Sequence, residues 1–510
     1  MNSNASCWNS TLPVVFIIIY DMHRYGIPIN ALHLCHVSIL LSAKVAIIFQ
    51  SPNFWDGKSC ILRINLIILQ NVLISNASQS IMLSEKDRKD IISLIKKQVV
   101  PAIGCTEPMA VALCVAKARK ALGCMPDSID IRLSANILKN AMGVGIPGTG
   151  LIGLPIAVAL GAIIGEPEAG LEVLRSCDKN SVEQGKKFIA EDRITISLET
   201  DDEDKLFINV ICKADGHEAE ARIKGEHTHF VYLRRDHEVM ISCEAKDKET
   251  DEGHSVNLTL AKVYEFATTT DIEELRFILE ARKLNESAAE KGLQDNYGHQ
   301  LGKTLCSPLG KGIMGDSIFA EIISRTSCAC DARMAGAMIP VMSNSGSGNQ
   351  GICTTMPVVV FAEENHNTEE ELIRALVMSN LTAIYIKQNL GTLSALCGCV
   401  VASTGSSCGI TYLMGGNYEQ VSYSVKNMIA NLTGMICDGA KPSCALKLTT
   451  GVGTAVMSAM LAMQHKYVTS CEGIIDDDVD QSIRNLTAIG SKGMDATDRF
   501  VLDIMTSKGN

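Results

Sequence analysis

The spacing of apolar residues predicts helices that begin just after residue 82. Residues 84–87 (SEKD) resemble a capping box, in which side chains satisfy the free amides at a helix start. Apolar residues then recur on one helical face, at Ile91, Ile92, Ile95 and Val99. Pro101 ends this helix, because its ring cannot continue one.

Two further helices are predicted from the same kind of pattern. One runs from about Met109 to Leu122 and stops at Gly123, and a short strand follows at 129–133. The apolar run 151–164 is shorter than the roughly 20 residues that cross a bilayer. We therefore interpret this run as a buried core helix.

Between residues 193 and 243 the period of the pattern changes to two. Alternating runs stand at 194–198, 207–212, 218–223 and 227–233. Asp215-Gly216 is a favourable two-residue turn between two of them. These runs predict an antiparallel sheet, on which His227 and His229 are interpreted as polar surface residues.

After a polar linker that ends at about residue 254, the pattern returns to helices separated by Gly, Ser and Cys loops. We therefore predict an α+β fold. Residues 82–190 and 255–510 would form a mainly helical domain, with a small antiparallel β domain and its linker inserted at 191–254. A chain of 510 residues with 46% hydrophobic content can bury cores of this size.

Residues 1–81 differ in composition from the rest of the chain. They carry four of the 46 basic and two of the 57 acidic residues. The run 14–19 is too short to cross a bilayer, and the run 31–49 is interrupted by two histidines and a lysine. No signal-peptide pattern is present. We interpret this segment as translated upstream sequence before a functional start at Met82, with membrane-anchoring helices as the alternative.

Charge and cysteine content narrow the class of function. A net charge of −11 disfavours nucleic acid and anionic membranes as partners, so a small-molecule ligand is expected. The 19 cysteines show no regular disulfide spacing, and a core of this size needs no disulfides. Such thiols suit a reducing cytoplasm, where some can serve as metal ligands or catalytic groups. A homo-oligomer is compatible with the sequence.

The segment GCTEP at 104–108 is the first candidate for chemistry. Thr106 is predicted to cap the next helix, with Glu107 and Pro108 in its first turn. Cys105 would then lie at the positive end of the helix dipole, which lowers a thiol pKa from the ~8.5 of free cysteine. A buried structural cysteine is the alternative.

The loop SNSGSGNQG at 343–351 is the second candidate, because its backbone amides can converge on a carboxylate. It lacks the lysine of a Walker A loop and the strand and glycine spacing of a dinucleotide loop. The candidate substrate-binding residues are Ser343, Asn344, Ser345, Gly346, Ser347, Gly348 and Asn349. Upstream, Arg333 can pair with a carboxylate ligand or with Asp331, and a structural turn remains the alternative for the loop.

Cysteines gather toward the C-terminus, at Cys397, Cys399, Cys408, Cys437 and Cys444. Sites rich in thiolates select zinc or iron-sulfur clusters over magnesium or calcium. The spacing has neither the paired CxxC of structural zinc nor the run of cysteines in ferredoxins. Spacing alone therefore leaves the metal open.

Five segments together resemble one family of enzymes. They are GCTEP (104–108), NILKNAMGVGIPGTGLIGLPIA (136–157), SCACDARMAGAMIPVMSNSGSGNQGI (327–352), LSALC (393–397) and GMICDGAKPSC (434–444). They closely resemble the L-cysteine desulfidases, which are related to the α-chain of iron-sulfur L-serine dehydratases. The resemblance extends from about Met82 to the end and does not include residues 1–81.

The resemblance implies a site and a reaction. In that family three cysteines hold a [4Fe-4S] cluster and leave one iron open, and their intervals match Cys397, Cys437 and Cys444. A further family cysteine, proposed as the catalytic base, corresponds to Cys105. The implied reaction is β-elimination from L-cysteine to pyruvate, ammonia and hydrogen sulfide, with the 343–349 loop holding the amino acid. Cys399 and Cys408 fall outside this ligand set.

Three other functions stay open from the sequence. An L-serine dehydratase would use the same scaffold, although the chain-end cysteine ligand of those enzymes is missing from residues 505–510. A non-catalytic iron-sulfur sensor would need a partner module, and none is visible. A pyridoxal-phosphate lyase would perform the same elimination with a Schiff-base lysine.

Overall fold

The computed structural model describes residues 83–199, 206–243, 256–391 and 394–508. The chain separates into two compact units, residues 1–80 and 81–510, and all of the described residues belong to the second. The expectations for residues 1–81, and for most of the polar linker, fall outside the described residues.

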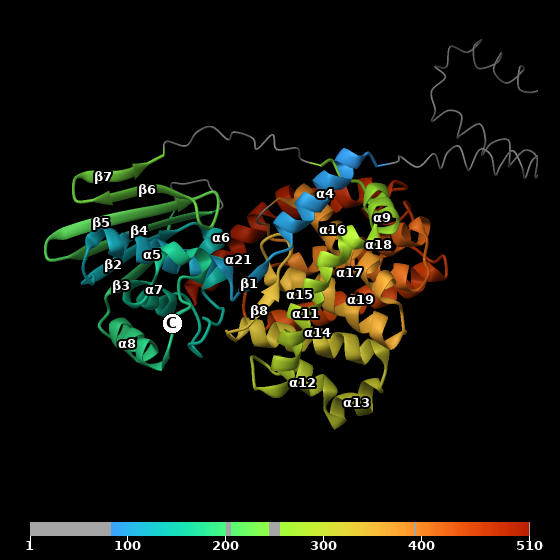
Figure 1. Cartoon of the computed structure of the whole chain (residues 1–510), viewed down its shortest axis with the longest axis horizontal. Coiled ribbons are helices and arrows are strands. Elements are labelled where there is room, and N and C mark those ends of the chain that lie inside the picture. The colour runs from blue at the N-terminus through green and yellow to red at the C-terminus, as the bar shows by residue number, and fades with distance from the viewer. Residues whose placement is uncertain (1–82, 200–205, 244–255, 392–393, 509–510) are drawn as a thin grey trace, which may run out of the picture. The chain divides into compact units, whose positions relative to one another are not determined.

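One lobe of the second unit is built around a six-stranded sheet (Figure 1). Its strands are β2 (Ser128–Leu133), β3 (Ile194–Leu198), β4 (Phe207–Ala214), β5 (His217–Lys224), β6 (Phe230–Arg235) and β7 (Glu238–Ser242). Its helical segments are α5 (Thr106–Leu122), α6 (Ala135–Ala141), α7 (Leu154–Ile163), η1 (Pro167–Glu172) and α8 (Lys179–Ala190). Helix α5 packs on β4 and β5, and α7 packs on α5.

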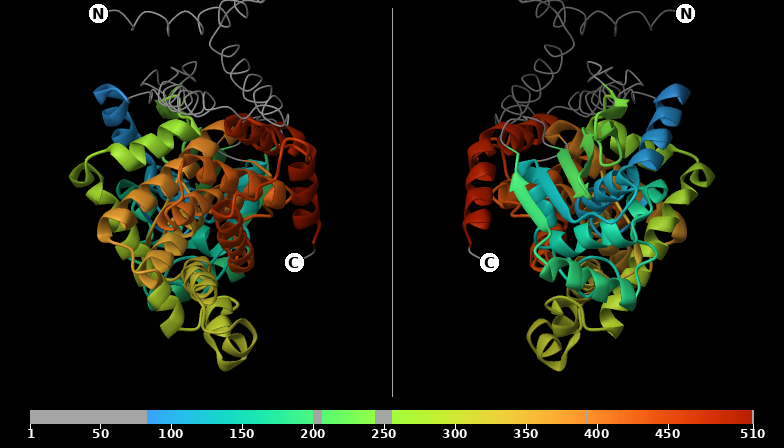
Figure 2. Two further views of the ribbon diagram at one scale, coloured as in Figure 1. Left: turned by 90° about the vertical axis from the view of Figure 1, so that its right-hand side faces the viewer. Right: turned by 90° about the vertical axis from the view of Figure 1, so that its left-hand side faces the viewer.

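The other lobe is helical. Its elements are α4 (Glu85–Gln98), α9 (Leu260–Thr269), α10 (Ile272–Leu275), η2 (Arg276–Ile278), α11 (Leu279–Gln294), α12 (Leu301–Cys306), α13 (Pro308–Met314), α14 (Ile318–Met334), α15 (Gly348–Glu364), α16 (Glu369–Leu390), α17 (Gly398–Leu413), α18 (Tyr418–Leu432), α19 (Cys444–Met463), α20 (Val479–Ala488) and η3 (Ile489–Gly493). A short antiparallel pair joins β1 (Pro101–Ile103) to β8 (Pro340–Met342). The last helix, α21 (Asp495–Ser507), packs against α6 of the sheet lobe. It is the red helix that leads to the C-terminus in Figure 2.

The helix predictions near the start of this unit are confirmed. Ser84 caps α4, and its hydroxyl accepts from the amide of Asp87 at 3.0 Å while the Asp87 carboxylate accepts from the amide of Ser84 at 3.2 Å. Gly123 ends α5 with a φ of 87°, in the left-handed region that glycine adopts without strain. The apolar run beginning at Leu151 contains the buried helix α7.

The predicted strands are present, but the sheet is mixed and larger than predicted. Its order is β3-β2-β4-β5-β6-β7, with β2 and β3 parallel and every other pair antiparallel. The additional strand β2 precedes the predicted insertion, and its residues Ile129, Ile131 and Leu133 point into the core. Asp215 and Gly216, with φ of 50° and 81°, form the predicted turn between β4 and β5.

Two hydrophobic cores correspond to the two lobes. One is formed mainly by the helical lobe, and the other by buried residues between 109 and 233 together with Leu502. The α+β class is confirmed. The second core includes α5 and α7, so the predicted domain boundary at residue 191 falls inside it, because burying one face of the sheet requires the helices that precede it.

Helix α17 lies at the centre of the helical lobe, in contact with α15, α16, α18 and α19. Small residues allow this close packing. A Cβ at Gly405 would lie 2.3 Å from the backbone oxygen of Ser379 on α16, so only glycine fits there. The position of α17 matters for function because Cys397 immediately precedes it.

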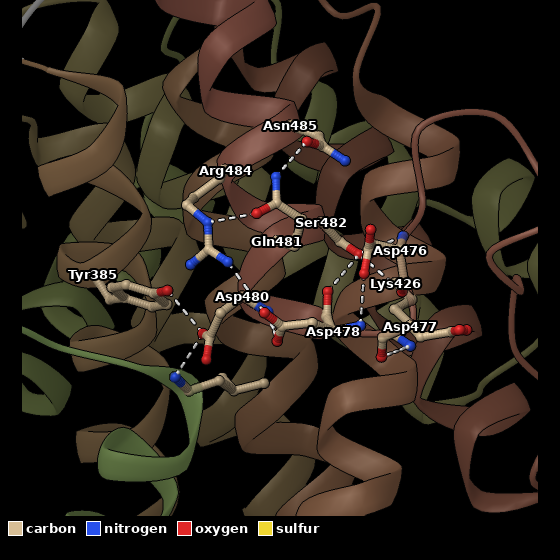
Figure 3. Close-up of polar contacts among 11 residues, drawn as sticks. Tyr385, Lys426, Asp476, Asp477, Asp478, Asp480, Gln481, Ser482, Arg484 and Asn485 are labelled. Carbon is tan, nitrogen blue, oxygen red and sulfur yellow. Dashed lines mark hydrogen bonds and ion pairs between the residues drawn. The ribbon is translucent and has the colours of Figure 1, made fainter. Parts of the chain in front are cut away.

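A polar network fixes α20 against the neighbouring helices (Figure 3). Asp480 accepts hydrogen bonds from the Tyr385 hydroxyl at 2.7 Å and from the amide of Leu260 at 2.9 Å. The Lys426 ammonium donates to the backbone oxygen of Asp477 at 2.8 Å. The network thus joins α9, α16, α18 and α20 through charged groups at the start of α20.

Among the described residues, α19 is the one helix whose length and composition would allow it to cross a membrane. In its most apolar window, 56% of the residues are buried inside the protein, as in the core helix of a globular protein.

Candidate active site

A cavity of about 150 Å³ joins parts of the chain that are distant in sequence. It is lined by Cys105, Thr106, Glu107, Asn140, His227, Arg333, Ser345, Gly346, Ser347, Asn349, Gln350, Lys387, Ser394, Leu396, Gly398 and Ala440. The volume is below the range of pockets for drug-sized ligands, so the cavity suits a molecule as small as one amino acid.

Cys105 lies in this cavity at the start of α5. It is the N-cap residue, a position that the sequence assigned to Thr106, and its side chain makes no capping hydrogen bond. The Cys105 thiol instead donates to Oε2 of Glu107 at 2.9 Å, and the Thr106 hydroxyl donates to the same oxygen at 3.1 Å. The first turn of α5 therefore brings a thiol and a carboxylate together.

The pKa of the Cys105 thiol is raised well above its ordinary value, first by burial and then by the negative charge of Glu107. Arg333 acts in the opposite direction with a smaller effect. The expectation of a lowered pKa is therefore wrong. The helix dipole is outweighed because the thiol is only 5% exposed and lies beside a carboxylate.

Arg333 is a buried cation at the end of α14, with 4% of its surface exposed. Its Nη1 donates to Oδ1 of Asn349 at 2.9 Å, and its Nη2 donates to the backbone oxygen of Gly104 at 2.8 Å. Asp331, the alternative partner considered from the sequence, instead accepts from the amide of Gly302 at 3.2 Å. Arg333 thereby ties the GCTEP segment to the loop before α15.

That loop contains a tight turn. The amide of Asn344 donates to Ser347 at 3.1 Å, and the amide of Ser347 donates back to Asn344 at 3.0 Å. The two residues between them, Ser345 and Gly346, have φ of 48° and 78°, as in the two-residue turns of hairpins. Ser347 then caps α15, accepting from the amide of Gln350 at 3.4 Å.

The predicted substrate-binding loop divides into two sets of residues. Four of its members line the cavity: Ser345, Gly346, Ser347 and Asn349. The Ser343 hydroxyl donates to the backbone oxygen of Val100 at 2.6 Å, and the amide group of Asn344 donates to Asn380. A Cβ at Gly348 would lie 2.2 Å from Nε of Arg333. These three residues support the loop and do not line the cavity.

The three cysteines matched to the cluster ligands lie on adjoining segments. An antiparallel bridge pairs Leu396 with Ile436, so that Cys397 and Cys437 flank it, and the amide of Cys397 donates to Met435 at 2.9 Å. Cys444 begins α19, and its thiol donates to the backbone oxygen of Gly439 at 3.7 Å. Burial raises the pKa of both Cys397 and Cys444.

The loop between Cys437 and Cys444 is held by charged groups. Lys441 and Lys447 both form ion pairs with Asp438. Burial acts to raise the pKa of Asp438, but hydrogen bonds from the two lysines hold it at about 2. A Cβ at Gly439 would lie 2.2 Å from the backbone oxygen of Lys139, so the loop packs tightly against α6.

The donor type of these three cysteines is the one that iron-sulfur clusters take. No three His, Cys, Asp or Glu side chains converge to hold one metal ion within the described residues. Three thiols on adjoining segments, two of them at helix N-termini, match the ligand type of an iron-sulfur cubane, whose thiolates bind separate irons. The cavity reaches these segments through Leu396, Gly398 and Ala440.

Several cavity residues were not singled out from the sequence. His227, interpreted there as strand surface, lies in the loop between β5 and β6 and reaches the cavity. Asn140 and Gln350 stand inside segments that carry the family resemblance, which was the available signal. Lys387 gave none, because it lies near the end of a long helix and outside the five matched segments.

Comparison with known proteins identifies the family. The model of the serine dehydratase alpha chain matches residues 168–503. This chain belongs to the serine dehydratase alpha-chain family. The chain is also similar to proteins named UPF0597, a name that states no substrate.

The similarity to these relatives covers most of both chains. The relative from Bacteroides thetaiotaomicron is 67% identical over 425 residues, which are 83% of this chain and 99% of the relative. A relative from Bacteroides fragilis is 65% identical over 427 residues, 84% of this chain and 100% of the relative. One from Oleidesulfovibrio alaskensis is 47% identical over 418 residues, 82% and 97% of the two chains.

Proposed function

We propose that this protein is an iron-sulfur-dependent lyase of the cytoplasm that converts L-cysteine and water to pyruvate, ammonia and hydrogen sulfide. The observation that carries the proposal is the shared cavity, in which Cys105 faces the segments that bear Cys397 and the 437–444 loop. Membership of the serine dehydratase alpha-chain family supports a lyase of small amino acids. The 16 free cysteines of the described chain are in keeping with a reducing compartment.

In this proposal Cys397, Cys437 and Cys444 hold a [4Fe-4S] cluster. The support is their donor type, the bridge that joins two of their segments and the helix N-terminus at Cys444. When bound, a cluster with one iron free of protein ligands supplies a Lewis acid for the negative charge that develops on the substrate. The ion pairs of Asp438 keep the ligand loop in one conformation.

Cys105 is the proposed base. Its thiolate removes the Cα proton, and the electron pair left on Cα forms the double bond as the bond from Cβ to sulfur breaks. The resulting aminoacrylate takes up a proton at Cβ, and the imine is hydrolysed by water to pyruvate and ammonia. Before each cycle the thiol must lose its own proton, for which Oε2 of Glu107 is the hydrogen-bond acceptor at 2.9 Å.

Dehydration of L-serine is the second candidate, because the matched family is described by that activity and hydroxide is also a β-leaving group. Anaerobic reconstitution with iron and sulfide, followed by a pyruvate assay on both amino acids, tests the two. We expect faster turnover of L-cysteine, with sulfide formed in equal amount. Turnover of L-serine alone would assign the second candidate, and a loaded cluster without turnover of either would favour a sensor. Absorbance of the purified protein would reveal pyridoxal phosphate.

The state of Cys105 predicts a pH dependence. Burial and Glu107 raise the pKa of this thiol, so the thiolate fraction, and with it the rate of Cα proton removal, should rise with pH from neutral into the alkaline range. Glu107→Gln removes the negative charge and should move the rising limb of kcat to lower pH. The measurement is kcat for L-cysteine against pH in both proteins. If kcat rises over the same pH range in both proteins, the Glu107 carboxylate does not set the pKa of the Cys105 thiol.

A further inference from the structure

Of the charged side chains that line the cavity, Arg333 and Glu107 have opposite signs and form no ion pair with the other described residues. Arg333 is 4% exposed and Glu107 is half-buried. Burying a charge without a counter-charge is costly. Their retention in one small cavity therefore indicates a ligand that supplies both charges.

Each of these groups also has hydrogen-bonding capacity to spare. A guanidinium carries five N–H donors, and Arg333 uses one on Nη1 and one on Nη2. Glu107 accepts both of its hydrogen bonds on Oε2, which leaves Oε1 without a donor from the described residues. The cavity also contains Oε1 of Gln350, a buried acceptor without any hydrogen-bond partner. Buried polar atoms of this kind are normally satisfied, so a ligand with donor groups is expected here.

We propose that Arg333 and Glu107 together select a zwitterionic α-amino acid, Arg333 by binding the carboxylate and Oε1 of Glu107 by binding the ammonium. The guanidinium fork matches a carboxylate with two parallel hydrogen bonds. Molecules with only one of the two charges, such as 2-hydroxy acids and simple amines, leave one buried charge unpaired and are rejected.

The same arrangement places the reacting carbon. Cα is bonded directly to the ammonium nitrogen and to the carboxylate carbon, so fixing both groups fixes Cα between Arg333 and Glu107. Cys105 lies close to both residues. Its thiol donates a hydrogen bond to Glu107, and the charges of Glu107 and Arg333 both affect the pKa of the thiol. The reaction that follows binding rests on the proposed function. Binding of the amino acid by Arg333 and Glu107 does not require the cluster.

Three small ligands without a β-leaving group allow the carboxylate contact and the ammonium contact to be tested one at a time. L-Alanine has both, L-lactate keeps the carboxylate, and L-alaninol keeps the ammonium. Their dissociation constants can be measured by ligand-observed NMR titration of the full-length protein, before and after cluster reconstitution. Arg333→Lys changes the side chain proposed to bind the carboxylate, and Glu107→Gln changes the one proposed to bind the ammonium. Ser343→Ala is the control, because the Ser343 hydroxyl donates to Val100 outside the cavity.

We expect the wild-type protein to bind L-alanine at least about tenfold more tightly than either analogue. Arg333→Lys should weaken the binding of L-alanine and L-lactate by about 10- to 100-fold, because hydrogen bonds to charged groups contribute on this scale. The affinity for L-alaninol should not change. Glu107→Gln should weaken L-alanine and L-alaninol and leave L-lactate unchanged. The control should bind all three ligands as the wild type does.

Equal weakening of all three ligands in either variant, or no weakening, would overturn the proposal. If Arg333→Lys fails to fold by circular dichroism, the Glu107→Gln pattern decides alone, since that side chain is half-buried and keeps its shape. A protein with the expected selectivity but no turnover of L-cysteine or L-serine would refute the proposed function and leave this inference intact. If the protein is an active lyase and both variants keep the wild-type KM, the proposed function stands and this inference is refuted.

Discussion

Replacing Cys397, Cys437 or Cys444 with alanine is expected to bleach the brown iron-sulfur absorbance of the reconstituted protein and to abolish turnover. Each variant removes one of the three thiols that the proposal assigns as ligands of the cluster. Loss of Lewis-acid assistance, which contributes several kcal/mol, corresponds to about 100-fold or more in rate. Iron and sulfide content, with absorbance and EPR spectra, measures the cluster independently of activity.

Cys408→Ser is the matched control for these variants. Cys408 lies on α17, the helix that begins after Cys397, and is fully buried among hydroxyl side chains that accommodate serine. It should keep the full iron content and most of the activity. A complete [4Fe-4S] complement in any one of the three alanine variants would remove that residue from the ligand set.

Cys105→Ser is expected to keep the cluster and to lose Cα proton abstraction. The substitution changes one atom in a group that hydrogen-bonds Glu107, so the cavity should keep its shape. A serine hydroxyl is scarcely ionised near neutral pH, and general-base catalysis typically contributes about 100-fold to 10,000-fold. The direct measurement is exchange of the substrate Cα proton with deuterated solvent, which should slow by a factor in this range.

Thr106→Ser provides the comparison for this variant, because it keeps a hydroxyl beside Glu107 and leaves Cys105 in place. It should exchange the Cα proton at close to the wild-type rate. If Cys105→Ser exchanges and turns over like the wild type with a full cluster, Cys105 is structural. His227, which also lines the cavity, would then be the next candidate for the base.

The sequence alone was most informative where local chemistry decides the outcome. The capping box at Ser84, the stop at Gly123, the Asp215-Gly216 turn and the alternating strands all follow from contacts between residues close in the chain. The matched motifs likewise led to the family, and four of the seven predicted loop residues line the cavity. Each of these features depends on a few neighbouring side chains, which the sequence displays directly.

Tertiary structure decided what depends on residues far apart in the chain. It put β2 into the sheet, because three alternate apolar side chains needed a second strand and helices to cover them. It raised the pKa of Cys105 against the effect of the helix dipole, because burial and a carboxylate are not visible from a cap position. It also brought Arg333, Glu107 and His227 into one cavity. Burial and charge balance are sums over the whole fold, so local sequence cannot determine them.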